Sequence, residues 1–254
     1  MQKFLTSLII GVLAVFFLNG INLIFVSLEL PIYLASILPL ILLPEVLLKL
    51  LLFQAVPPYT SNKTTLENCS HFNVDIDKFK NYCSDLETVG FEKLIDYGVP
   101  NSKGMARLFY YPEYNCYAEV AMVEGTSVFC SIVSGFEENW FFAATNHNSS
   151  VNLRAISYVF LSLPRTMCKI FNEEPKALFE SFLHWQSEVQ NKLSVETIAI
   201  AGEEMYFAWE RNKREMQRQR LMRKSIIISL IKMFLFSLNP KSEWMGDYPK
   251  YSNQ

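Results

Sequence analysis

Residues 105–124, MARLFYYPEYNCYAEVAMVE, are the stretch that decides the fold class of this chain. Two apolar, aromatic-rich runs, 105–111 and 116–124, flank a segment of turn-forming residues, a pattern typical of strands joined by a turn. Residues 123–126, VEGT, then predict a second tight turn. Because the connections are short, the neighbouring strands must run antiparallel.

Similar runs lie on both sides of this stretch. Residues 91–99, 126–135 and 139–146 are also apolar, aromatic-rich and bounded by turn-forming residues. The spacing of about ten residues predicts a β-meander rather than a parallel sheet, which would need long crossovers. Further on, 165–171 resembles an edge strand, and 155–163 could be either a strand or buried irregular chain.

Two amphipathic helices are predicted beside the strands. The first carries apolar residues at Phe79, Tyr82, Leu86 and Val89 and ends at Gly90. The second begins after Asn172 as the expected N-cap, with Pro175 in its first turn. Its apolar stripe comprises Leu178, Phe182, Trp185, Val189 and Leu193. An antiparallel sheet covered by two helices on one face gives an α+β domain.

Consecutive aromatic rings place large side chains on both faces of some strands. They occur at 109–111 and 140–142. The face without the two helices then needs a second cover, which could be the long final helix, the membrane surface, a partner protein or an apolar ligand. Cover by the chain itself is the favoured interpretation.

The first sixty residues predict a membrane-embedded helical hairpin. Residues 4–28 contain no charged side chain, and a helix of this length exceeds the roughly 30 Å hydrocarbon core of a bilayer. A secretory signal peptide is disfavoured because the run is too long and lacks a small-residue cleavage site. The second run, 30–56, contains Pro39 and Pro44, so it is either a kinked span or a re-entrant or interfacial segment.

Glu45 and Lys49 form a predicted charge pair within the second run. They are four residues apart with the acid first, which allows an ion pair on one helix face. The pair could be an intramembrane proton or ion site. The favoured alternative places it near the interface, with Lys49 extended towards the headgroups, because two short segments offer few surfaces for a pathway.

Flanking basic residues predict the orientation of the hairpin. Lys3 precedes it and Lys63 follows it, whereas the connection between the two runs has no Lys or Arg. The positive-inside rule then places both termini and the soluble domain in the cytoplasm. Five scattered cysteines without a CxxC pair agree, since they are typical of reduced thiols.

Charge is divided unevenly along the rest of the chain. Residues 61–210 carry eleven Lys or Arg against twenty Asp or Glu, a charge of −9, although the whole chain carries only −2. Residues 211–224 carry seven basic residues against Glu215, a charge of +6. The seven are Arg211, Lys213, Arg214, Arg218, Arg220, Arg223 and Lys224.

This basic run predicts a second membrane attachment. Ser194 is expected to cap a long helix that continues into the run, and residues 225–238 then turn apolar but are too short to span. A basic stretch beside an apolar segment attracts anionic lipid. Docking on the acidic domain or on a protein partner is the alternative. Nucleic acid is not expected, because the run lacks groups that stack on or read bases.

Catalytic signatures are weak. Cys116, Glu113, Glu119 and His147 are the candidates for a thiol-dependent or hydrolytic site, since a cysteine nucleophile needs a histidine base and paired carboxylates can act as acid and base. Each also has an ordinary structural interpretation. The sequence contains no phosphate-binding loop, dinucleotide fingerprint or zinc motif, so no cofactor and no metal are expected.

These patterns define four predicted regions. They are a membrane hairpin (1–56), a linker (57–76), an α+β domain (77–193), and a long basic helix with an apolar membrane-proximal segment and tail (194–254). The predicted function is a membrane-anchored protein whose cytoplasmic domain serves binding, sensing or scaffolding. A membrane-bound hydrolase or thiol-dependent enzyme, and an accessory subunit of a membrane complex, are the alternatives.

Overall fold

The computed structural model describes residues 45–51, 53–54, 56, 59, 62–67, 73–99, 102–198 and 202–245. The chain divides into two compact units, Met1–Ala55 with Ser225–Ile227, and Val56–Lys224 with Ile228–Gln254. The predicted span 4–28 and most of the second apolar run lie outside the described residues. No helix within the described ranges is long and apolar enough to cross a membrane.

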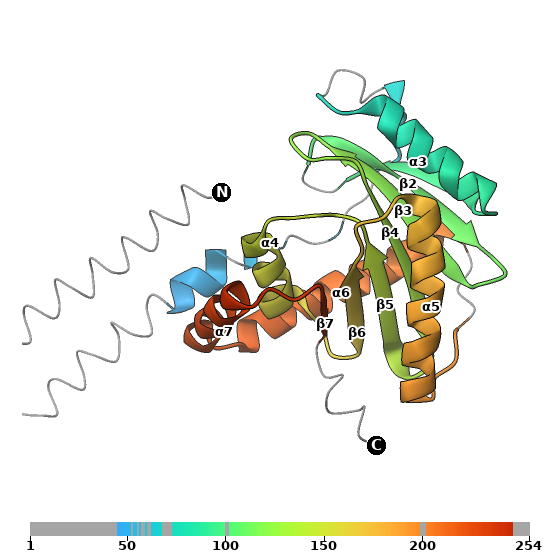
Figure 1. Ribbon diagram of the computed structural model, residues 1–254. Coiled ribbons are helices and arrows are strands. Elements are labelled where there is room, and N and C mark those ends of the chain that lie inside the picture. Colours follow the sequence, from blue (N-terminus) through green and yellow to red (C-terminus); the bar gives the residue numbers. More distant parts are fainter. Residues whose placement is uncertain are drawn as a thin grey trace, which may run out of the picture. The chain divides into compact units, whose positions relative to one another are not determined.

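The predicted meander is confirmed as the first five strands of the sheet in the larger unit. They are β1 (Glu92–Gly98), β2 (Gly104–Tyr111), β3 (Cys116–Val123), β4 (Phe129–Phe136) and β5 (Trp140–Thr145), each antiparallel to the next (Figure 1). The turn after β3 closes with a bond from Thr126 N–H to the Val123 carbonyl, 3.0 Å. Gly125 takes a positive φ of 77° there, a conformation that glycine adopts without a Cβ clash.

The sheet is mixed rather than wholly antiparallel. β6 (Thr166–Ile170) pairs parallel to β5, and a short β7 (Glu243–Met245) pairs antiparallel to β6. β6 is therefore not the edge strand that the sequence suggested. The parallel pairing needs a crossover, and residues 146–165 provide it.

That crossover is helical, so the expectation of a strand or irregular chain at 155–163 was wrong. α4 (Val151–Ile156) begins at Ser150, whose hydroxyl accepts the N–H of Leu153, and continues into a π-helical turn, η3 (Ser157–Leu161). An apolar run of this length is compatible with a strand or a helix, and the N-cap at Ser150 stabilises the helix.

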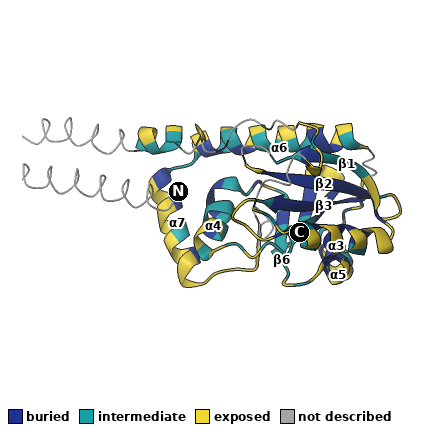
Figure 2. Cartoon of the chain, turned by 90° about the horizontal axis from the view of Figure 1, so that it is seen from above, coloured by how far each residue is buried: buried dark blue, intermediate teal, exposed yellow. Residues whose placement is uncertain are grey.

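The two predicted helices cover one face of the sheet, and together they confirm the α+β class (Figure 2). α3 (Ile76–Thr88) has Asp75 as its N-cap and stops before Gly90, which has a φ of 106°. α5 (Pro175–Leu193) starts two residues later than predicted, with Glu174 rather than Asn172 as N-cap. Its buried residues include Leu178, Phe182 and Trp185.

The opposite face of the sheet is covered by α6 (Glu203–Arg223), so the chain itself supplies the second cover (Figure 2). Tyr206 and Phe207 enter a buried cluster with Tyr97 and Tyr117, and Trp209 stacks on the strand residue at 141 with ring centroids 3.9 Å apart. Both faces of the sheet are therefore buried, which explains the aromatic residues at consecutive strand positions.

The predicted long helix is interrupted twice. Ser194 ends α5 in a left-handed conformation instead of capping a new helix, and α6 begins only after Gly202. Lys224 then ends α6 with an extended ψ of 141°, and α7 (Ile226–Leu238) follows. The basic run and the apolar segment thus lie on two separate helices.

Candidate functional site

The proposed catalytic residues do not converge. Cys116 and Glu119 lie three positions apart on β3, so their side chains project from opposite faces of the sheet. Cys116 belongs to the core under α3 and α5, whereas the carboxylate of Glu119 contacts residues on the α6 side. Glu113 lies exposed in the turn before β3.

Cys116 is a core thiol in this fold. Its side chain is fully buried, and burial raises its pKa well above that of an ordinary cysteine. Since the thiolate is the nucleophilic form, this environment disfavours nucleophilic chemistry. The other described cysteines, Cys83, Cys130 and Cys168, are also free thiols whose pKa is raised by burial.

His147 follows β5 and lies far from Cys116 along the sheet. Its ring packs on Phe129 with centroids 4.5 Å apart, and Phe129 pairs with Ala121 of β3. Cys116 pairs instead with Ser134, five register positions away. Burial lowers the pKa of His147, which favours the neutral ring. The arrangement does not assemble a thiol–histidine pair.

Glu119 lies at the centre of a polar cluster that the sequence did not reveal. Its Oε2 accepts a short hydrogen bond from the Tyr97 hydroxyl and a 2.9 Å bond from the Tyr206 hydroxyl. Burial raises the pKa of Glu119, although both tyrosine donors oppose the shift. One carboxylate thus joins β1, β3 and α6, which is a structural role for a residue predicted as an acid or base.

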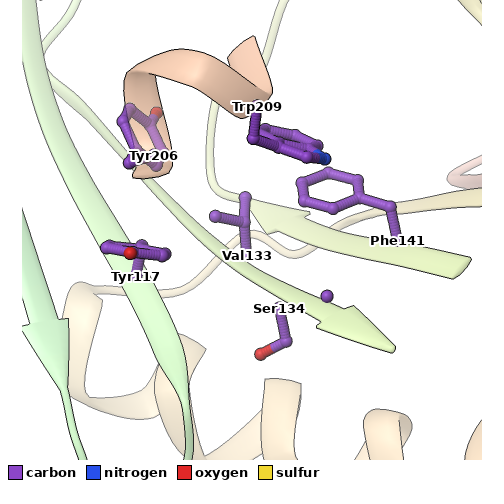
Figure 3. A pocket seen from close by; sticks show the side chains of 7 residues that line it. Tyr117, Val133, Ser134, Phe141, Tyr206 and Trp209 are labelled. Atoms are coloured by element: carbon purple, nitrogen blue, oxygen red, sulfur yellow. The ribbon is translucent and has the colours of Figure 1, made fainter. Parts of the chain in front are cut away.

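A small pocket lies beside this cluster, between α6 and the sheet (Figure 3). Its lining is Tyr117, Val133, Ser134, Gly135, Phe141, Tyr206 and Trp209. The hydroxyl of Ser134 points away from the aromatic rings of α6 in this view, so the polar group is not presented to the pocket. The apolar lining lacks the convergent polar groups that orient a substrate.

The basic residues of α6 do not form one solvent-facing stripe. Lys213 pairs with Glu210 at 2.8 Å and lies 4.6 Å from the centroid of the Trp209 ring. Arg218 donates to the carbonyl of Val56 at 2.9 Å. These residues already have partners in their own domain.

The remaining five basic residues differ in exposure. Arg211 and Arg223 are exposed, whereas Arg214, Arg220 and Lys224 are half-buried. The Lys224 ammonium donates a short hydrogen bond to the Val159 carbonyl in η3. The sequence could not show this division, because the run has no apolar stripe strong enough to fix which side of the helix faces the domain.

Helix α7 has one face on the domain and one face exposed. Ser229, Met233 and Phe236 lie at helical spacing on the inner face, and Phe236 stacks on Tyr158 with centroids 5.1 Å apart. The outer face remains apolar. It comprises Ile227, Ile228, Leu230, Ile231, Phe234, Leu235 and Leu238, with exposures from 47% to 67%.

The pair Glu45–Lys49 belongs to the smaller unit. Residues 45–51 are helical, and Lys49 Nζ lies 3.0 Å from Glu45 Oε1, with both side chains mostly buried. The ion pair is the one that the four-residue spacing allows. Its location within a membrane stays a prediction.

No group of three or more His, Cys, Asp or Glu within the described ranges could hold a metal ion. Comparison with known proteins gave no matching family model, no matching curated protein and no matching solved structure. The candidate site therefore rests on this chain's own geometry. That geometry points to the outer face of α7 and the cations near its start.

Proposed function

We propose that this chain is a membrane-anchored protein whose α+β domain is held at the bilayer surface and serves binding, sensing or scaffolding without catalysis. The observation that carries the proposal is the outer face of α7. Seven large apolar side chains lie exposed on a helix of 13 residues, about 20 Å long. Soluble surfaces rarely expose such a contiguous patch, which is typical of a contact with membrane or protein.

The bilayer is the favoured partner of this face. A helix that is apolar around most of its circumference needs an apolar environment there, and among the described residues the domain covers only the side of Met233 and Phe236. Basic residues on the last turns of α6, such as Arg223, suit contact with anionic headgroups. The predicted hairpin at 1–56 would provide the stronger anchor, and α7 would orient the domain.

The enzyme alternative receives no support from the geometry of its candidates. Cys116 and Glu119 face opposite sides of the sheet, and His147 packs on Phe129, five register positions from Cys116. The accessory-subunit alternative predicts that the outer face of α7 contacts another protein. It therefore becomes an outcome of the same experiment.

The experiment measures the membrane depth of α7 in the full chain. A nitroxide is placed at Phe234→Cys in protein reconstituted into nanodiscs, and its collision rates with oxygen and with a water-soluble nickel complex are compared. We expect high access to oxygen and low access to nickel, because oxygen partitions into hydrocarbon. A nitroxide at Met216→Cys, on the exposed side of α6, is the matched control and should show the reverse.

Two results would overturn the proposal. High nickel access at Phe234→Cys would place the face in water. Low access to both reagents would show that protein rather than lipid covers it. Since the side chain of Phe234 is 64% exposed, its replacement should not disturb the domain.

A further inference from the structure

Two cationic residues lie at the end of α6, and a third lies on α7, the helix that follows. Arg220 and Lys224 are one helical turn apart, and the backbone N–H of Lys224 donates to the Arg220 carbonyl at 3.2 Å. The Lys224 ammonium is fixed by its hydrogen bond to the Val159 carbonyl. Lys232 lies exposed on α7. The three residues belong to the larger unit of the chain.

Within the described ranges, no acidic side chain forms an ion pair with Arg220, Lys224 or Lys232. The pKa of Lys224 is lowered to about 8, first by burial and then by the positive charges of Arg220 and Lys232. Glu215, the acid within the basic run, lies 3.9 Å from Arg218 and accepts a hydrogen bond from Gln219 instead. Like charges held together without a counter-charge favour an anion.

Arg220 also carries an unused donor. Its Nη1 is buried and finds no hydrogen-bond acceptor in the part of the chain that the structure describes. A buried guanidinium nitrogen without an acceptor is costly, and a guanidinium is well suited to phosphate oxygens. This unmet donor is independent of the electrostatics of Lys224, and both observations point to the same kind of ligand.

The cluster shares α7 with the exposed apolar face. Lys232 follows Ile231 in the sequence, and Ile228 and Leu235 lie one turn away on either side of it along the helix. A lysine within an apolar helix face can extend its ammonium to the headgroup level while its neighbours enter the acyl region. Cations and apolar side chains therefore lie next to each other on this surface, as the charged headgroup and the acyl chains do in a phospholipid.

We infer that Arg220, Lys224 and Lys232 bind the phosphate of an anionic lipid headgroup at the base of the α7 outer face. The inference rests on the proposed membrane contact and specifies which residues of the domain bind the lipid headgroup. The seven basic residues of α6 do not act as one diffuse patch, since Lys213 and Arg218 are already held by the domain. The specific contact is made by Arg220 of α6, by Lys224 at the end of that helix and by Lys232 of α7.

The test compares lipids that carry a nitroxide on the acyl chain. Full-length protein is reconstituted with a trace of labelled phosphatidic acid or labelled phosphatidylcholine, and the motionally restricted fraction gives the relative affinity of each. We expect the wild type to prefer the anionic lipid. In Lys232→Gln the preference for the anionic lipid should fall about fivefold, which is the effect of one cation near a bilayer surface. Lys232→Arg should restore it.

A matched control removes the same charge elsewhere. Arg211→Gln changes an exposed residue on the side of α6 that the domain leaves open, and it should keep the wild-type preference. Equal preference in wild type and Lys232→Gln would overturn the site, and so would an equal loss in Arg211→Gln. Because Lys232 is exposed, its replacement should leave the fold intact.

The two proposals fail in different ways. If the nitroxide at Phe234→Cys reports an aqueous environment, the membrane contact itself is wrong. If that nitroxide lies in hydrocarbon while the labelled lipids show no dependence on Lys232, the membrane contact stands and only the headgroup site is wrong. Arg220→Gln provides a second variant of the site, and its loss of preference should be similar to that of Lys232→Gln.

Discussion

Two apolar surfaces of this molecule differ in what covers them. The sheet face opposite α3 and α5 is rich in tyrosine, and α6 buries it with Tyr206 and Phe207. The outer face of α7 is aliphatic apart from Phe234, and no described part of the chain buries it. The first surface contains hydroxyls that need internal partners such as Glu119, whereas the second has only hydrocarbon to present. The presence or absence of polar groups that need hydrogen-bond partners therefore distinguishes an apolar surface that packs inside the protein from one that suits a bilayer.

The largest expected effect is that of truncating Phe207, which lies in the buried contact between α6 and the sheet. Phe207→Ala should lower the free energy of unfolding by about 3–5 kcal/mol, because it empties a buried contact between α6 and the sheet. The measurement is urea unfolding of the full chain in detergent micelles, followed by tryptophan fluorescence. A loss below about 1 kcal/mol would mean that α6 is not a true cover of the sheet.

The hydrogen bonds of Glu119 between the sheet and α6 should give the next largest loss of stability. Glu119→Ala leaves the hydroxyls of Tyr97 and Tyr206 without their acceptor, and we expect a loss of about 1–3 kcal/mol. The same unfolding measurement checks it. Glu119→Gln retains one acceptor oxygen and should cost less, so the order of the two variants is part of the prediction.

The pH dependence of this link has a defined sign. Because burial raises the pKa of Glu119, the folded state binds the proton more tightly than the unfolded state does. The stability from this group is present below the ordinary glutamate pKa and is lost as pH rises through the raised value. The advantage of wild type over Glu119→Gln should therefore be smaller at pH ~7 than at pH ~4. A growing advantage with rising pH would contradict the assignment.

The smallest stability effect belongs to the outer face of α7. Phe234→Ser and Leu238→Ser should change the free energy of unfolding of the α+β domain by less than about 0.5 kcal/mol, because both side chains are exposed. Leu238→Ser should nevertheless weaken membrane contact in the nitroxide measurement at position 234. If either variant destabilised the domain as Phe207→Ala does, the two surfaces would not differ.

The strands and the two helices on one face could be predicted because their signals are local. Residues 105–124 alternate towards two sides of the sheet, and Gly90 and Gly125 mark turns that need positive φ. The crossover at 151–161 was missed because an apolar run of that length fits a strand or a helix. The parallel pairing of β5 and β6 depends on that crossover, so it was missed as well.

The site was harder to predict because its residues meet only in three dimensions. Glu119 was recognised as a candidate, but its role depends on Tyr97 and Tyr206, which are distant in the sequence. Lys232 interrupts the apolar segment 225–238, and an isolated cation in such a segment indicates a position at the headgroup level. The partners of Lys213 and Arg218 could not be inferred, since a basic run does not reveal which of its residues the domain holds.

The central claim is that the outer face of α7 enters the acyl region of the bilayer, whereas α6 does not. It is tested most directly by labelling the full chain in membranes with a lipid-soluble carbene reagent and mapping the modified peptides by mass spectrometry. Cleavage after Lys224, Lys232 and Lys241 separates α7 from α6. We predict strong labelling of the peptides 225–232 and 233–241 and little of those from 203–223. Equal labelling of both helices, or none on α7, would contradict the claim.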